Sequence, residues 1–240
     1  MANFGFEIVD DVPDRFSELV LDFVRRDRLV LLSGGHTILD LIKPLHSHLA
    51  ADLSVVPRIG QIDERLVLPS SHDSNWRTIE GGLSGVSFKG FPIISSRTPT
   101  ENRILEEDES AGSMESKGIL ATSYARRYQQ VILENGPLGL AHLGLGLDGH
   151  TASLFPGSAA LAETERLVTV SSDPSGQNSH LRVTCTLAAL NSFELRVVVA
   201  LGLSKSEIVQ RAIHGSGLPI HRLNPDSTVF LLDREAGSLL

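Results

Sequence analysis

LGLAHLGLGLDGHTASLFPG, residues 138–157, joins an apolar run directly to a glycine-rich turn. The run from Leu138 to Leu145 is typical of a strand buried on both faces, as strands are in parallel α/β sheets. Glycines at 144, 146 and 149 permit tight turns and a close approach of the backbone to a ligand. The stretch therefore predicts a central parallel strand with His150 at its carboxyl end.

Helical and strand patterns alternate over the rest of the chain. The spacing predicts helices at 12–23, 38–49, 74–83, 119–133 and 205–214, and strands at 29–32, 55–62, 91–94, 167–171, 181–186, 195–201 and 228–232. We also expect Asp233 to cap a short terminal helix. This alternation favours an α/β fold with a doubly wound, mainly parallel sheet flanked by helices. The length suits a single domain over 1–240, with a mobile polar insertion at about 95–117 that has little to bury.

Composition restricts the classes of function. A net charge of −8 and the absence of a basic run argue against a nucleic-acid partner, because binding the phosphate backbone requires clustered Lys and Arg. Cys185 is the only cysteine, so no intramolecular disulfide is possible. The sequence contains neither a signal-peptide pattern nor an apolar stretch of about 18 residues, so we expect a cytoplasmic protein without a membrane role. The histidines form no metal-ligand spacing, and we expect no metal.

His150 is the candidate general base. Ligands of open α/β sheets bind outside the carboxyl ends of the strands, and imidazole is the side chain whose ordinary pKa lies nearest to neutrality. A histidine in this position can activate water. The alternative is a hydrogen-bonded structural histidine on an ordinary turn.

A glycine pair after the first predicted strand is a candidate anion site. Ser33-Gly34-Gly35-His36-Thr37 lies between a strand and a helix, where backbone N–H groups and the helix dipole can hold a phosphate. The spacing matches neither of the common nucleotide-binding glycine motifs. A glycine pair that serves only packing is the alternative.

Charged side chains follow other predicted strands. Arg65, in Asp63-Glu64-Arg65, can bind a phosphate through its planar guanidinium, or can pair with Asp63 on a surface loop. Ser204-Lys205-Ser206-Glu207 is typical of a capping box, which puts Lys205 in the first helical turn, where a bound anion would offset its charge. Otherwise Lys205 points into water. Arg182 lies on a strand with Thr184 and Thr186, whose polar face lines the site or, as we expect for the threonines, meets solvent.

Four groups of residues each lie at the carboxyl end of a different predicted strand: the glycine loop at 33–37, Asp63 with Arg65, His150, and Lys205. Their convergence favours one common site over four unrelated features. Three groups would bind an anion, and His150 would supply a base.

The same residues, in this order, resemble the 6-phosphogluconolactonase family. The resemblance covers nearly the whole chain and includes SGGHT at 33–37, DER at 63–65, SN at 74–75, GLGLDGHTASLFPG at 144–157, RVTCT at 182–186 and GLSK at 202–205. DGHTASLFPG is highly specific, and the other segments are individually weak. The resemblance implies the α/β fold that this family shares with glucosamine-6-phosphate deaminases and ribose-5-phosphate isomerases.

The resemblance also implies a reaction: hydrolysis of 6-phospho-D-glucono-1,5-lactone to 6-phosphogluconate in the oxidative pentose phosphate pathway, without a cofactor. By this match His150 is the general base, and Asp148 either orients it or only forms the turn. Phosphate-binding or substrate-binding roles fall to Gly34, Gly35, His36, Thr37, Asp63, Arg65, Arg182 and Lys205. Asp63 would contact sugar hydroxyls or hold Arg65. The oligomeric state stays open, with a monomer slightly favoured.

The chain departs from the family pattern at four positions. His36 and Ile38 replace the usual hydroxyl residue and proline of the first loop, Gly139 replaces an aspartate, and His142 replaces an aliphatic residue. These changes put one hydroxyl contact to the phosphate in doubt.

Two other functions remain open. A glucosamine-6-phosphate deaminase would share the glycine loop and DGH but continue with a GHIAFNEP-like segment, which differs from Thr151–Pro156 here. A sugar-phosphate sensor would normally add a helix-turn-helix and a basic surface, and neither is evident.

Overall fold

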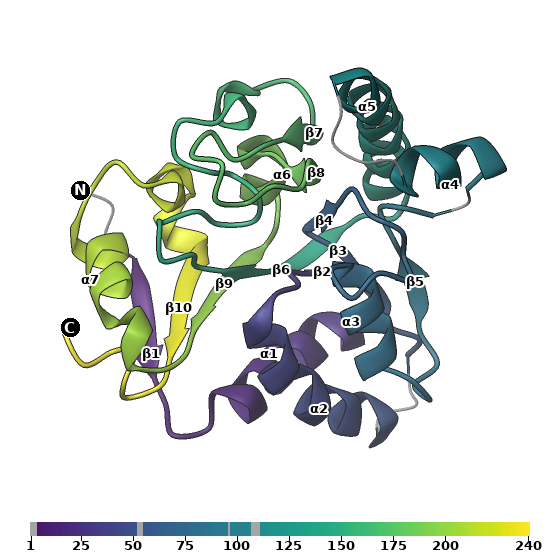
Figure 1. The fold of residues 1–240 in the computed structure, drawn as a ribbon. Coiled ribbons are helices and arrows are strands. Elements are labelled where there is room, and N and C mark those ends of the chain that lie inside the picture. Colours follow the sequence, from purple (N-terminus) through teal and green to yellow (C-terminus); the bar gives the residue numbers. More distant parts are fainter. Residues whose placement is uncertain (1–3, 52–54, 96, 107–110) are drawn as a thin grey trace.

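The computed structural model describes residues 4–51, 55–95, 97–106 and 111–240, and places a seven-stranded parallel sheet at the centre (Figure 1). The strand order is β1-β10-β9-β6-β2-β3-β5. The strands are β1 (Gly5–Ile8), β2 (Leu29–Leu32), β3 (Arg58–Gln61), β5 (Lys89–Phe91), β6 (Leu138–Gly144), β9 (Leu195–Ala200) and β10 (Thr228–Leu232). The predicted α/β class with a mainly parallel, doubly wound sheet is confirmed.

Helices cover both faces of this sheet. On one face lie α1 (Val12–Arg25), α2 (His36–Ala51) and α3 (Asn75–Gly82), and on the other lie α5 (Ala111–Glu134), α6 (Leu187–Asn191) and α7 (Ser206–His214). Strand β2 explains why both faces need cover. Its four residues are all buried, with Leu29 and Leu31 in one apolar cluster and Val30 and Leu32 in the other, because successive side chains point to opposite faces.

A second, antiparallel sheet packs on the α5 side. It has the order β4 (Asp63–Arg65), β8 (Arg182–Cys185), β7 (Val168–Ser171). The sequence patterns predict two of these strands but not their separate sheet. The short strand β4 pairs with β8 so that Asp63 lies opposite Thr184, and Arg65 opposite Arg182.

Several predicted boundaries are wrong. Helix α5 begins at Ala111, not 119, and α4 (Pro99–Glu106) occupies much of the predicted insertion at 95–117. Leu105 of α4 is buried in the core beside α5, so the described part of this segment is helical and packed. Residues 96 and 107–110 lie outside the described part, and the mobility of the segment stays a prediction. Asp233 caps a turn, through the N–H of Ala236, and not a helix.

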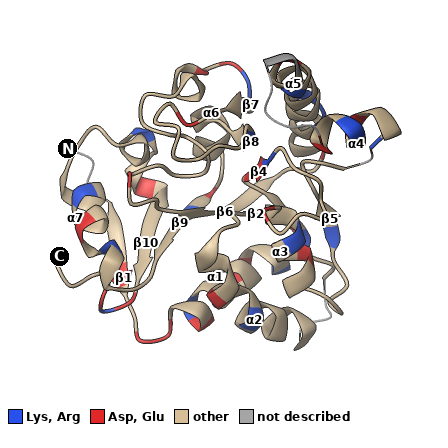
Figure 2. Cartoon of the chain, in the orientation of Figure 1, with Lys and Arg blue, Asp and Glu red and all other residues tan. Residues whose placement is uncertain are grey.

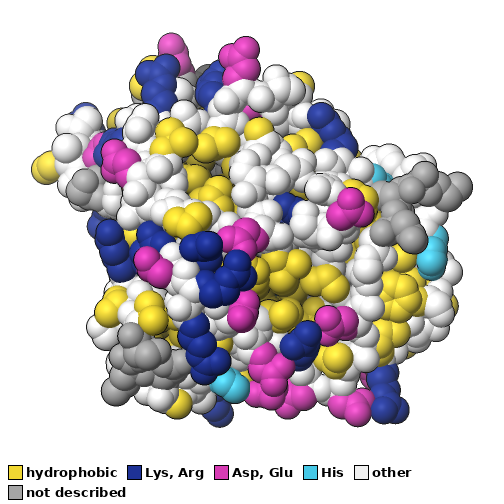
Figure 3. Space-filling view, turned by 180° about the vertical axis from the view of Figure 1, so that it is seen from behind, with side chains coloured by type: hydrophobic (Ala, Val, Ile, Leu, Met, Phe, Trp, Pro, Cys, Tyr) yellow, Lys and Arg dark blue, Asp and Glu magenta, His cyan; other side chains and the backbone are white. Residues whose placement is uncertain are grey.

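Charges are dispersed over the molecule (Figure 2). In the view from behind, basic, acidic and apolar side chains are interspersed (Figure 3). Among the coloured residues of Figure 3, this face of the molecule has no broad basic patch. Within the described residues, none of the helices combines the length and the hydropathy that crossing a bilayer requires.

Two of the unusual residues of β6 lie in the core. A Cβ atom at Gly139 would lie 2.4 Å from the Cβ of Arg28, so the chain leaves no space for an aspartate there. His142 is fully buried and packs edge-on against Phe16, with ring centroids 4.9 Å apart. Neither of its ring nitrogens has a hydrogen-bond partner among the described residues, and burial lowers its pKa to about 3.

We expect His142→Leu to stabilise the fold by about 1–2 kcal/mol at pH 7, because the change removes two unsatisfied buried polar atoms. The gain should grow at lower pH. Below the ordinary pKa of 6.5, His142 is protonated in the unfolded chain, but in the folded protein it stays neutral down to about pH 3. The free energy of unfolding of the wild type therefore falls by up to about 1.4 kcal/mol per pH unit in this window. The variant has no histidine at this position and does not show this decrease. Urea unfolding at pH 7.5 and 5.5 measures both effects, and equal stability of the two proteins at both pH values would contradict the prediction.

Candidate active site

The carboxyl ends of β2, β3 and β6 border a cavity of about 370 Å³. Nine of the ten predicted site residues line it: Gly34, Gly35, His36, Thr37, Asp63, Arg65, His150, Arg182 and Lys205. The tenth, Asp148, reaches the cavity through His150. The structure thus brings the predicted residues together, and the cavity also includes Asn75, Gly144 and Ala152, which the sequence analysis did not assign to a site.

The glycine loop after β2 forms one wall of the cavity. A Cβ atom at Gly34 would lie 2.0 Å from Oδ1 of Asn75, and Gly35 has a φ of +84°, so both positions require glycine. Ser33 fixes the start of the loop by donating a hydrogen bond to the carbonyl oxygen of His142, at 2.8 Å. The sixteen-residue helix α2 begins at His36 and has no acidic residue in its first turn. Its free N–H groups and its dipole therefore favour an anion at this wall.

His150 and Asp148 form a hydrogen-bonded pair on the turn after β6. Nδ1 of His150 lies 2.6 Å from Oδ1 of Asp148, which also accepts the backbone N–H of His150 at 3.2 Å. A carboxylate beside Nδ1 favours the tautomer with the proton on Nδ1. Nε2 makes no hydrogen bond to a described residue, so its lone pair is free. The pair lies against Gly146, where a Cβ would come within 2.3 Å of Nδ1.

Asp63 and Arg182 face each other across β4 and β8. Their side chains are only 6% and 7% exposed, with 3.8 Å between Oδ2 of Asp63 and Nη1 of Arg182. Ser153 donates to the same Oδ2 at 2.5 Å, and Asn178 accepts from Nη2 of Arg182 at 3.2 Å. Asp63 therefore does not hold Arg65, which was one of the two alternatives that the sequence left open for Asp63. Arg65 instead donates to the carbonyl oxygen of Asp73, at 2.7 Å.

Arg182 has unused hydrogen-bonding capacity. Its Nε is buried without a partner among the described residues, and burial lowers the pKa of this guanidinium, which the charge of Asp63 opposes. Arg182 lines the cavity, where a guanidinium can bind an anion through charge-assisted hydrogen bonds.

The prediction that Thr184 and Thr186 face solvent is wrong, because both are fully buried. The hydroxyl of Thr184 accepts the N–H of Ser153 at 3.2 Å, and Thr186 caps α6 through the N–H of Ala189.

Lys205 enters the cavity from the turn before α7. Its Nζ donates to the carbonyl oxygen of Leu145 at 2.6 Å, and burial lowers its pKa, an effect that the nearby charge of Asp148 opposes. The predicted capping box is wrong, since α7 begins at Ser206 with no side-chain cap and Lys205 occupies the N-cap position. The side chain therefore points toward the site and not into water.

Glu64 is a structural residue that the sequence analysis missed. Its buried carboxylate accepts hydrogen bonds from the backbone N–H groups of Arg65, Asn75 and Trp76 and from the side chains of Gln61 and Ser74. Burial raises the pKa of Glu64, and these donors oppose the rise. The carboxylate ties the end of β3 to the start of α3 and thereby places Asn75 against Gly34. The only sequence signal was a charged triplet at a strand end.

We expect Glu64→Gln to destabilise the protein by about 3 kcal/mol or more, because its amide NH₂ would face at least two of these donors. Denaturant unfolding measures the loss. Glu80→Gln is the matched control, since Glu80 lies on α3, the helix whose start Glu64 holds, and is exposed. Similar losses in the two variants would contradict the role of Glu64.

Comparisons with known proteins agree on one family. The model of the family described as glucosamine-6-phosphate isomerases/6-phosphogluconolactonase matches residues 7–231. The chain is 32% identical to the 6-phosphogluconolactonase of Rattus norvegicus over 225 residues, which cover 90% of this chain and 82% of that one.

Solved structures agree on the fold. A 6-phosphogluconolactonase from Trypanosoma cruzi has a TM-score of 0.82 at 22% identity, covering 100% of this chain and 97% of that chain. A monomeric glucosamine-6-phosphate deaminase has a TM-score of 0.71 at 16% identity, covering 98% and 100%. At these identities the two structures establish the fold alone.

Proposed function

The chain belongs to the glucosamine-6-phosphate isomerase/6-phosphogluconolactonase family, and we propose that it hydrolyses 6-phospho-D-glucono-1,5-lactone to 6-phosphogluconate. One observation carries the proposal: a single cavity contains a histidine with a free Nε2 and, on its other walls, the cations and backbone N–H groups that bind an anion. The carbonyl group of the lactone would lie at the histidine, and its phosphate would lie at the anion-binding groups.

His150 would act as the general base. Nε2 takes a proton from water as the water oxygen attacks the lactone carbonyl carbon and forms a tetrahedral intermediate. The imidazolium then returns a proton to the ring oxygen as the bond between that oxygen and the carbonyl carbon breaks. Asp148, 2.6 Å from Nδ1, keeps the proton on that nitrogen and stabilises the imidazolium between the two steps.

The phosphate would bind to other residues of the same cavity. Gly34, Gly35 and Thr37 offer the N–H groups of the α2 start, and Arg182 and Lys205 offer charge-assisted donors. Arg65 and His36 border the same space, so both are available to the phosphate oxygens. Asp63 positions Arg182, and its Oδ1 remains available for a sugar hydroxyl. No step of this mechanism needs a metal or an organic cofactor.

The deciding experiment is an assay on freshly generated 6-phosphogluconolactone, with the spontaneous rate subtracted. We expect turnover of the phosphorylated lactone, much weaker turnover of glucono-1,5-lactone, and no ammonia release from glucosamine 6-phosphate. Ammonia release without lactone hydrolysis would favour a deaminase. Ligand binding without either reaction would favour a sugar-phosphate sensor. A cytoplasmic location and a monomeric state remain predictions.

A further inference from the structure

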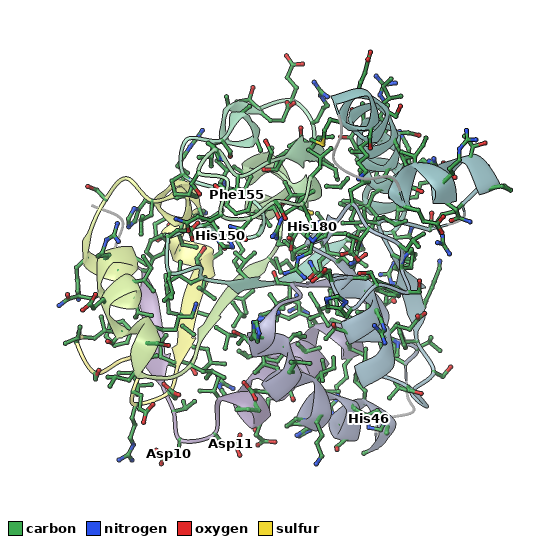
Figure 4. All side chains as sticks on the ribbon, in the orientation of Figure 1. Asp10, Asp11, His46, His150, Phe155 and His180 are labelled. Atoms are coloured by element: carbon green, nitrogen blue, oxygen red, sulfur yellow. The ribbon has the colours of Figure 1, made fainter. Side chains whose placement is uncertain are left out.

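The ring of Phe155 contacts both the histidine and the arginine of the site. Its centroid is 4.7 Å from that of the His150 imidazole, with the planes inclined at 45°, and Cζ of Arg182 lies 5.4 Å from the same centroid. Figure 4 places the side chains of His150 and Phe155 side by side. Phe155 is fully buried, so one rigid side chain contacts both of these groups.

A tight turn brings Phe155 back to His150. The hydroxyl of Thr151 donates to the carbonyl oxygen of Gly144 at 2.9 Å, and the N–H of Leu154 donates to the carbonyl oxygen of Thr151 at 2.9 Å. Ala152, within the turn, adopts a φ of +53°, which is uncommon for a residue other than glycine. The chain thus reverses within four residues, and the aromatic ring after the turn packs against the imidazole.

Neither neighbour of Phe155 is fully fixed by its hydrogen bonds. The His150 ring is held by Asp148 at Nδ1 alone, and a single hydrogen bond leaves the inclination of the ring undetermined. Arg182 makes hydrogen bonds of 3.2 and 3.5 Å and a 3.8 Å ion pair with Asp63 through its Nη atoms, and Nε has no partner among the described residues. The negative face of an aromatic ring attracts a guanidinium, and an inclined imidazole packs well on such a ring. Phe155 therefore adds a rigid packing contact to both.

We propose that Phe155 is a positioning residue that sets the spacing between the hydrolytic base and the anion-binding guanidinium. The inference rests on the proposed function, and it assigns to Phe155 part of the selectivity for lactones that carry a phosphate. Only a lactone whose carbonyl and phosphate match this spacing reaches His150 and Arg182 together. A flexible side chain at position 155 leaves both groups present and loses their fixed separation.

The test compares Phe155→Leu with Phe193→Leu, because Phe193 is another buried phenylalanine, whereas the ring contacts with His150 and Arg182 are made by Phe155. We expect Phe155→Leu to lower kcat about tenfold on both the phosphorylated and the phosphate-free lactone and to raise KM about fivefold for the phosphorylated one only. The ratio of the two kcat/KM values should therefore fall about fivefold. Phe193→Leu should lose stability and keep the ratio. An unchanged ratio in folded Phe155→Leu overturns the proposal.

A second measurement does not depend on turnover. Calorimetry with inorganic phosphate reports the anion site, and the ¹H shift of the His150 ring protons reports its contact with the aromatic ring. We expect about fivefold weaker phosphate binding and a changed histidine shift in Phe155→Leu, with neither change in Phe193→Leu. If the wild-type protein hydrolyses no lactone, the proposed function fails while these two readouts still decide the role of Phe155. Unchanged phosphate affinity in Phe155→Leu, or no phosphate binding by the wild type, overturns the proposed role of Phe155.

Discussion

His150→Ala is expected to lower kcat for the phosphorylated lactone by about 10²–10⁴-fold, the usual contribution of a positioned general base. The alanine variant retains the turn, because the carbonyl oxygen of residue 150 still accepts the N–H of Gly146. It lacks the Nε2 lone pair that would take the proton from water. Steady-state assays of the purified variant, corrected for spontaneous hydrolysis, measure the effect.

KM should change less than threefold in this variant, since the phosphate would bind on other walls of the cavity. His180→Ala is the matched control: His180 is partly exposed, lies near Asp73 and does not line the cavity. Its kcat should equal that of the wild type. Unchanged turnover in a folded His150→Ala protein would rule out the proposed base and leave the fold assignment intact.

The sequence predicted four strands of the parallel sheet well, because β2, β6, β9 and β10 are mostly apolar. β2 and β10 have the expected limits, and β6 and β9 end one residue earlier than the patterns predicted. The edge strand β1 was missed, since it has only four residues, Gly5–Ile8, and they are mostly exposed. Helix α4 was missed because only Leu105 among its residues is buried, so its helical pattern is nearly invisible in the sequence.

The convergence of the site was also predictable. In a parallel sheet all carboxyl ends lie at one edge, so His150 and the Gly34-Gly35 loop were expected at the same edge, and the strand order then makes them neighbours because β6 lies beside β2. The partner of Asp63 was not predictable. It depends on the antiparallel register of β4 and β8, which joins residues 63–65 to residues 182–184, and nothing local in either segment specifies that register.

The segment from Asp148 to Phe155 is informative because nearly every side chain in it has a separate contact. Asp148 holds the imidazole, Thr151 fixes the turn to β6, and Ser153 holds the carboxylate of Asp63. Phe155 then packs against both the imidazole and Arg182. A substitution at any of these positions disturbs a different part of the cavity, which explains why this one stretch has more diagnostic value than the short motifs elsewhere.

Lys205→Met is expected to raise KM for the phosphorylated lactone by about 10–100-fold, because a charge-assisted hydrogen bond in a partly buried site contributes about 1.5–3 kcal/mol. Methionine keeps most of the aliphatic stem and removes the ammonium group. Phosphate-free lactone has no group for that ammonium to bind, so its kcat/KM should stay within about twofold of the wild-type value. Parallel kinetics on the two lactones measure the difference.

Lys43→Met is the control for the Lys205 experiment, since Lys43 is exposed on α2 and lies outside the cavity. It should leave both lactones unaffected. An equal loss on the two lactones in Lys205→Met would assign the ammonium to the reacting carbonyl, the group that both substrates share. Because Nζ donates to the carbonyl oxygen of Leu145, five residues before His150, that outcome would move Lys205 from the phosphate wall to the side of the base. A loss confined to the phosphorylated lactone places the phosphate at Lys205.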